Sequence, residues 1–172
     1  LGLLLIPVMA TTEIYRPTGL NDETIARWAE NESFTVITNG AGNEYYSGSP
    51  NATTGLVLLQ STISSGGFTD SSKVAASINT AAIPDGETIT SATLTIYIED
   101  AYNGLGDIGL ALTGYTPETT GLVHYDDINK MKSAPYAANI TWGSYSGAGN
   151  YTFTLNAAGI AAINKTGYTN LM

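Results

Sequence analysis

The residues best suited to chemistry gather in one glycine-rich turn in the second half of the chain. Asp100, Asn103 and Asp107 place two carboxylates and one amide on this turn. Oxygen atoms of this kind are the ligands that Ca²⁺ prefers in proteins. The spacing is not that of an EF-hand, so a solvated turn is the default interpretation and a calcium site is the alternative. We expect no other cofactor.

The only histidine, His124, precedes two further carboxylates, Asp126 and Asp127. A histidine beside carboxylates is able to act as a general base. No Gly-x-Ser-x-Gly sequence, paired metal histidines or phosphate-binding loop accompanies it. Nothing in the sequence selects a pair of carboxylates for glycoside hydrolysis either. We therefore interpret His124 as a surface or loop residue and expect the chain not to be an enzyme.

Aromatic residues offer a second kind of site, because sugars stack on exposed rings. The chain has eleven tyrosines and two tryptophans. In β-sandwiches such rings more often pack in the core or against a neighbouring strand, and this is the competing interpretation. The candidates for a sugar platform are Tyr45, Tyr46, Tyr136, Trp142, Tyr145 and Tyr151.

The surface is expected to be coated with hydroxyls and amides rather than charges. Only 12% of the 172 residues are charged, and the net charge is −9, whereas about a quarter of residues are charged in an average soluble domain. This composition is typical of extracellular and cell-wall proteins, so we expect an extracellular or cell-surface location. The six lysines and arginines are scattered, and we expect no binding to nucleic acid, which requires a basic stripe.

Sequons for N-linked glycosylation fit the same location. The pattern Asn-x-Ser/Thr occurs five times, which in a chain rich in these residues also arises by chance. The predicted acceptors in a glycoprotein are Asn31, Asn51, Asn139, Asn150 and Asn164.

The first ten residues differ from the rest because they are almost wholly apolar. Leu1–Ala10 resembles the apolar region of a signal peptide. As a helix it would span only ~15 Å of a ~30 Å bilayer core, so we expect no membrane span. As a strand it would reach roughly 33 Å, and both of its faces would require burial. Pro7 removes one backbone donor and fits a strand with one side unpaired or bulged.

The side chains of this candidate assembly strand are Leu1, Leu3, Leu4, Leu5, Ile6, Val8 and Met9. Their burial is worth on the order of 10–20 kcal/mol.

Residues 11–172 are predicted to form one all-β domain, without a repeat, a linker or a cysteine. Its clearest strand lies in Thr88–Glu99, where Leu94, Ile96 and Ile98 alternate with polar residues. Many short strands at near-regular spacing favour a jelly-roll-like antiparallel β-sandwich. A short helix is expected at Ala157–Asn164, and a strand is preferred to a helix within Asp22–Glu30. The other predicted strands are Glu13–Tyr15, Ile25–Trp28, Ser33–Thr38, Gly55–Gln60, Lys73–Ile78, Ile108–Thr113, Asn139–Trp142 and Tyr151–Leu155.

Three stretches resemble one known family. Residues 79–97 (Asn-Thr-Ala-Ala-Ile-Pro-Asp-Gly-Glu-Thr-Ile-Thr-Ser-Ala-Thr-Leu-Thr-Ile-Tyr), 33–43 and 151–167 are similar to DNRLRE-type, disaggregatase-related β-sandwich modules. The resemblance covers roughly residues 11–172. It implies a jelly-roll-like fold found in cell-surface, secreted and phage structural proteins, with a role in carbohydrate binding or architecture.

One departure from this family suggests a function. Its members continue beyond the stretch that matches Lys165–Gly167 into strands that close the sandwich, whereas this sequence ends at Met172. We therefore expect an apolar groove that lacks one strand. Residues 1–10 of a neighbouring copy would fill it by strand addition and build a pilus-like filament or sheath. The alternatives are the same strand folded back in a monomer, a carbohydrate-binding surface module, and a phage or virus structural domain.

Overall fold

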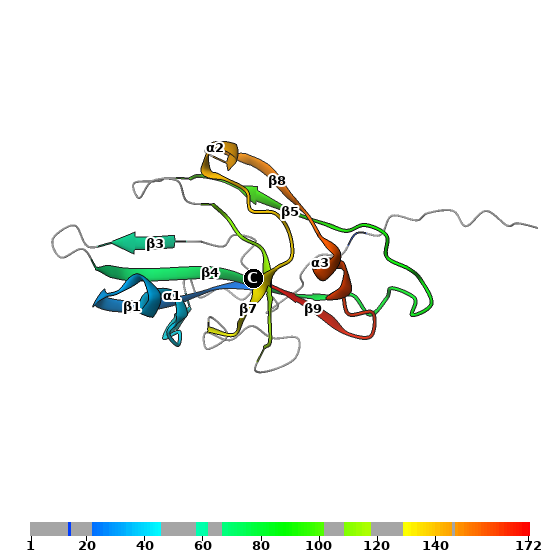
Figure 1. Cartoon of the computed structure of the whole chain (residues 1–172), viewed down its shortest axis with the longest axis horizontal. Coiled ribbons are helices and arrows are strands. Elements are labelled where there is room, and N and C mark those ends of the chain that lie inside the picture. The colour runs from blue at the N-terminus through cyan, green and yellow to red at the C-terminus, as the bar shows by residue number, and fades with distance from the viewer. Residues whose placement is uncertain are drawn as a thin grey trace, which may run out of the picture.

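The chain is an all-β protein whose strands form antiparallel sheets, so the predicted fold class is confirmed. The computed structural model describes residues 14, 22–45, 58–61, 67–101, 109–117, 129–145 and 147–172. Within these ranges two sheets stack as the layers of a sandwich, with three short helices at their margins (Figure 1). The jelly-roll strand order stays a prediction.

The larger sheet is organised around one long strand, β4. Its strands follow the order β2-β1-β4-β9-β6-β7. β1 pairs with one edge of β4, while β3 and β9 share its other edge, each along one half of the strand. The strands are β1 (Asp22–Glu32), β2 (Glu44–Tyr45), β3 (Leu58–Ser61), β4 (Phe68–Asn79), β6 (Thr113–Tyr115), β7 (Met131–Pro135) and β9 (Tyr168–Leu171).

The smaller sheet is a ribbon of two antiparallel strands, β5 (Thr93–Ile98) and β8 (Gly149–Thr154). Figure 1 shows it as a separate layer above β4 and β9. The main core lies between the layers, because buried Phe153 of β8 shares a cluster with Ile78 and Leu171 of the large sheet. Burial of such side chains is worth about 1.5–3 kcal/mol each and holds the layers together.

The opposite face of the large sheet carries a second, smaller cluster. Ile25, Ala75, Tyr115 and Met172 are buried there. Strand alternation places Lys73, which pairs with Ile25, on the same face. β4 is therefore covered on both faces, which explains why its burial pattern shows no simple period of two.

Two of the three helices in the described ranges begin at polar caps. In α1 (Phe34–Asn39) the Ser33 hydroxyl accepts a hydrogen bond from the Val36 N–H. In α3 (Ala157–Ala161) the Asn156 side chain accepts one from the Gly159 N–H. Such caps stabilise a helix by about 1 kcal/mol. α2 (Trp142–Tyr145) is a single turn, and none of the helices in the described ranges is long and apolar enough to cross a bilayer.

Several predicted elements are confirmed. Residues 25–28 lie in β1, residues 73–78 lie in β4, and residues 151–154 lie in β8. The helix expected at 157–164 is α3, although it ends earlier. The strand expected at 88–99 is confirmed only for 93–98. Of the strand expected at 55–60, residues 58–60 lie in β3 and residues 55–57 lie outside the described residues.

Other predictions are wrong. The strand at Ser33–Thr38 is helix α1, since the Ser33 cap and the burial of Ile37 outweigh the strand propensity of its β-branched residues. In the strands predicted at Ile108–Thr113 and Asn139–Trp142, the structure has an isolated bridge between Leu110 and Ile140. Thr113 is the first residue of β6, Trp142 is the first residue of α2, and Ile108 lies outside the described residues. Glu13–Tyr15 lies outside the described residues, apart from residue 14.

The residues after 167 form a strand, and the groove expected from a missing strand stays a prediction. Residues 168–171 form β9, which lies between β4 and β6 near the centre of the large sheet. Leu171 and Met172 are buried there, and the Met172 and Thr113 backbones exchange two hydrogen bonds of 2.9 Å. The end of the described chain is therefore part of the large sheet, and the narrower layer is the β5–β8 ribbon.

Candidate functional site

The β5–β8 ribbon presents an uncharged face to solvent. Cross-strand pairing sets Thr93 opposite Thr154, Thr95 opposite Thr152 and Tyr97 opposite Asn150. All six side chains lie on the outer face, and the Thr95 and Thr152 hydroxyls are 2.9 Å apart. Tyr97 is 66% exposed. This face combines an aromatic ring, an amide and four hydroxyls without any charge.

The inner face of the ribbon is apolar but incompletely covered. Leu94, Ile96 and Ile98 of β5 are only half-buried, whereas Phe153 of β8 is buried. Alternation along β1 and β4 places Trp28 on the same face of the large sheet as Ile78, yet Trp28 is 50% exposed. The second layer is thus narrower than the sheet that it covers.

The backbone of β5 has an open edge. The Leu155 N–H donates to the Ala92 carbonyl, which identifies Ala92 and Leu155 as a hydrogen-bonded pair. Antiparallel alternation then turns the N–H and C=O groups of Thr93, Thr95 and Tyr97 away from β8. No strand of the described ranges pairs with this side of β5.

Most of the predicted assembly and metal residues lie outside the described residues. This holds for Leu1–Met9 of the assembly strand, for Asn103 and Asp107 of the calcium turn, and for His124, Asp126 and Asp127. Of the calcium turn only Asp100 is described, and its carboxylate accepts a hydrogen bond from the Ala101 N–H. The described part of the chain contains no cluster of three acidic, histidine or cysteine side chains able to hold a metal ion.

Only two residues of the predicted sugar platform, Tyr136 and Tyr151, have described side chains. Tyr136 is 5% exposed and belongs to the main core, so its inclusion was wrong. Tyr151 is half-buried, and its hydroxyl donates to the Gly147 carbonyl at 2.7 Å. For Tyr45, Trp142 and Tyr145 only the backbone is described, in β2 and α2, and Tyr46 lies outside the described residues.

The structure describes the side chains of three of the five predicted glycosylation acceptors. Asn139, Asn150 and Asn164 are exposed. The Asn164 side chain accepts hydrogen bonds from the Thr166 N–H and hydroxyl within its own sequon. Asn31 lies in β1 without a described side chain, and Asn51 lies outside the described ranges. Three acceptors are therefore accessible, and glycosylation stays a prediction.

Sequence reasoning missed Tyr97 as a site residue. The signal was present, because Tyr97 belongs to the polar set of the strongest alternating strand. The alternation shows which face a residue occupies, but not whether a neighbouring element covers that face. Tyr97 is exposed because no described element packs over the ribbon.

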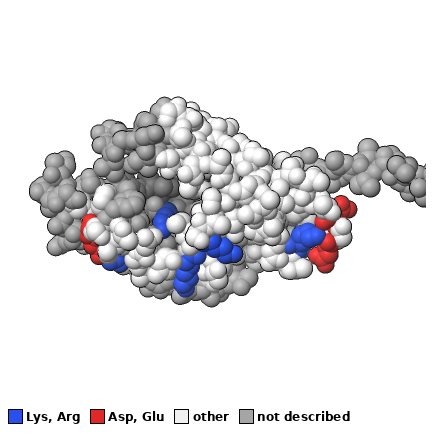
Figure 2. Space-filling view, in the orientation of Figure 1, with Lys and Arg blue, Asp and Glu red and all other residues white. Residues whose placement is uncertain are grey.

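Charged groups are few, and those with displaced pKa values lie away from the ribbon. Figure 2 shows scattered lysine, arginine and carboxylate side chains on an otherwise uncharged surface. Partial burial lowers the pKa of Lys73 on β4 to about 8. The hydrogen bond of Arg27 to Glu32, at 2.5 Å, raises the pKa of the guanidinium. Arg27 lies in β1 and Lys73 in β4, so neither group belongs to the outer face of the ribbon.

The fold and this surface define an all-β protein with a two-stranded outer layer. No known protein family, curated protein or solved structure matches the chain.

Proposed function

We propose that this protein is an extracellular structural subunit, and that copies of it assemble head-to-tail into a pilus-like filament or sheath through residues 1–10. The observation that carries the proposal is the half-buried apolar row Leu94, Ile96 and Ile98 beside an open strand edge. An added strand would cover this row and pair with the edge at the same time.

The N-terminal residues have the chemistry that such an edge requires. Seven of the first nine residues carry large apolar side chains. Exposed to water, this stripe would favour aggregation, because each buried side chain is worth about 1.5–3 kcal/mol. A contact made by one end of a subunit with a different surface of the next is heterologous, so it propagates. The hydroxyl-rich, weakly charged surface supports an extracellular location.

The test is particle size by negative-stain electron microscopy. The 172-residue chain is compared with a version that begins at Thr11. We expect filaments from the first and small uniform particles from the second. Small monodisperse particles from both chains would overturn the proposal, as would filaments from both, since residues 1–10 would then be unnecessary.

A carbohydrate-binding surface is the second candidate, favoured by the exposed Tyr97 ring among Thr93, Thr95 and Asn150. Such a face suits a neutral polysaccharide, which stacks on a ring and bonds to hydroxyls and amides. Binding to immobilised polysaccharides would then be lost in Tyr97→Ala and retained in Tyr151→Phe. Equal binding by both variants would remove this candidate.

A further inference from the structure

The large sheet and the ribbon each end in strands with one unpaired side, and these edges differ in how they resist pairing. Natural edge strands are protected by lysine, proline, bulges or a covering side chain. β7, at one end of the large sheet, contains Lys132 and Pro135 and has a register shift against β6. The Asn156 amide also covers the Pro135 carbonyl with a hydrogen bond of 2.9 Å.

β5 has none of these protections from the residues that the structure describes. Thr93–Ile98 contains no charged residue and no proline, and its pairing with β8 runs over six residue pairs without a register shift. The six residues extend about 20 Å. This edge is straight, neutral and β-branched, which is the composition that favours pairing with another strand.

We infer that the β5 edge, Thr93–Ile98, is the surface that accepts residues 1–10 of a neighbouring copy. The inference rests on the proposed function and assigns its acceptor. The chemistry of the two segments is complementary. The acceptor supplies backbone groups and a half-buried apolar row, and the donor supplies a strand with two apolar faces. A ten-residue strand of roughly 33 Å is long enough to cover all of β5.

Pro7 sets which donor residues pair. Proline has no N–H, so its side of the strand must point away from the acceptor. Leu4, Ile6 and Val8 have the opposite parity and therefore supply the backbone bonds to Thr93, Thr95 and Tyr97. The side of the donor that contains Pro7 is left unpaired, which limits the addition to one strand.

The solvent-facing side chains of the added strand would also contact the ribbon. Tyr97 is the most exposed large side chain of the ribbon, and it belongs to β5, the strand beside which an added strand would sit. Aromatic and aliphatic side chains on neighbouring strands stabilise each other. Tyr97 would cover part of the outer donor row, and the rest of that row would lie beside the threonines of β5.

The first experiment blocks one edge of the ribbon at a time. Thr95→Pro removes an N–H that points to the open edge of β5, so it breaks no bond to β8. Thr152→Pro is the matched control, because Thr152 is the cross-strand partner of Thr95 and its N–H points to the other edge of the ribbon. Both variants lose the same hydroxyl contact.

We expect Thr95→Pro to lower the pelletable filament fraction at least tenfold, with Thr152→Pro close to the parent chain. Circular dichroism melting of both variants checks that their folds are equally stable. Parental filament yield in Thr95→Pro, or a selective loss in Thr152→Pro, would overturn the assignment of β5.

A second experiment avoids proline and uses the absence of cysteine from the chain. Ile6→Cys is combined with Thr95→Cys, or with Lys132→Cys on β7 as the control, and a short bismaleimide is added. A ladder of cross-linked multimers is expected only for the first pair. A ladder from the Lys132→Cys pair alone would overturn the inference.

The remaining outcomes separate the inference from the function on which it rests. Cross-linking within one subunit would show the strand folded back on its own domain, against donation to a neighbour. Dimers from Thr95→Cys alone would show β5 pairing with β5, also against it. Filaments from the parent chain without the Thr95→Cys ladder would overturn the acceptor but leave the proposed function standing. No filaments from the parent chain would overturn both.

Discussion

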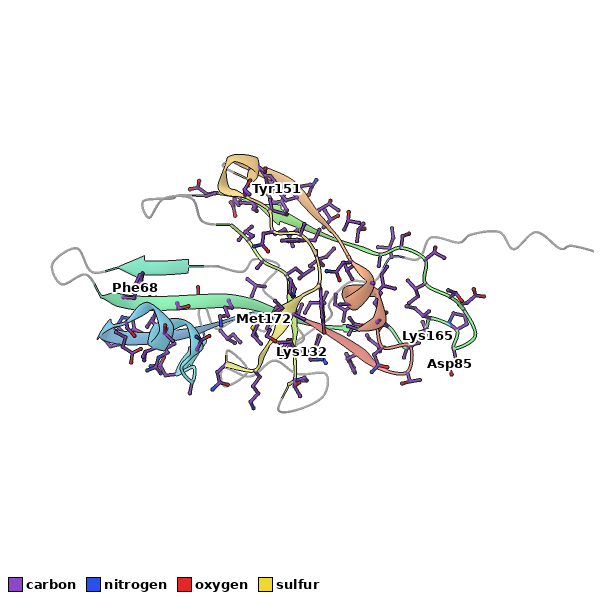
Figure 3. The ribbon with its side chains drawn as sticks, viewed as in Figure 1. Phe68, Asp85, Lys132, Tyr151, Lys165 and Met172 are labelled. Carbon is purple, nitrogen blue, oxygen red and sulfur yellow. The ribbon has the colours of Figure 1, made fainter. Side chains whose placement is uncertain are left out.

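The edge strands β5 and β7 lie in different layers of the sandwich, and they differ in how their unpaired backbone groups are protected against pairing. In Figure 3, Tyr151 of the ribbon lies near the top of the view and Lys132 of β7 lies below it. β7 carries a lysine, a proline and a register shift, and all five of its residues are exposed. β5 is neutral and regular, with alternate residues half-buried. β7 therefore carries features that oppose pairing with another strand, whereas β5 carries features that favour it.

The largest expected effect comes from transferring a protective residue between the edges. Thr95→Lys places on β5 the kind of residue that β7 has at Lys132. An added strand would then have to desolvate a charge. We therefore expect the amount of filament that sediments to fall at least tenfold. Lys132→Thr is the reciprocal change and should leave filament formation intact. Equal filament yields from the two variants would remove the distinction between the edges.

Substitutions in the ribbon and in β7 should also differ in how much they lower the free energy of unfolding. Phe153→Ala removes the buried anchor of the ribbon, and we expect it to lower the free energy of unfolding by about 3–5 kcal/mol. Met131→Ala on β7 alters a side chain that is 41% exposed, so its effect should be below about 1 kcal/mol. Urea denaturation of the monomeric fraction measures both. Similar losses would mean that β7 is packed as closely as the ribbon.

Lys73 of β4 should make the stability of the folded protein depend on pH. Burial lowers its pKa to about 8, so between pH 8 and 10.5 the folded chain binds fewer protons than the unfolded chain. Stability should therefore rise across this window, by about 1–3 kcal/mol. Lys73→Met should be more stable than the parent chain at pH 7, and the difference should shrink as the pH rises. A constant difference would show that burial of the charge has no cost.

The smallest effect is expected on the outer face. Tyr97→Ala alters an exposed side chain of the free subunit and should change the free energy of unfolding by less than about 0.5 kcal/mol. In the filament the same ring is expected to touch the donor strand, so filaments of Tyr97→Ala should dissociate at lower urea. Thr154→Ala, on the same face but on β8, is the control. Equal urea midpoints for the two variants would place the donor elsewhere.

The sequence predicted the elements whose environment differs between their two faces. β5 and β8 alternate threonine with apolar residues because one face is solvated and the other is packed, and this is visible in the sequence. β7 was missed because all five of its residues are exposed, and β9 because four residues give too short a pattern. The capped helix at Phe34–Asn39 was mistaken for a strand since propensity ignores the Ser33 cap.

The site was less predictable than the fold. The alternation placed Tyr97 and Thr95 on a polar face, but the lack of a second neighbour for β5 depends on how distant segments pack. Tyr136 was assigned to a surface because its type suits sugars, yet the close approach of its ring to Gly114 shows how tightly it is enclosed. A residue's type indicates which chemistry is available, and only the fold decides whether solvent or a ligand reaches it.

The place of β9 determines when this protein can fold. β9 pairs with β4, about ninety positions earlier in the chain, through contacts such as Ala76 with Leu171. It also bridges to β6 through Gly114. Until residues 168–171 have been synthesised, β4 and β6 have no connecting strand, and the sheet remains in two parts. Long-range pairing of this kind is slow. The two parts of the large sheet can therefore join only after β9 has docked between them, so the rate at which β9 pairs limits how fast the sheet is completed.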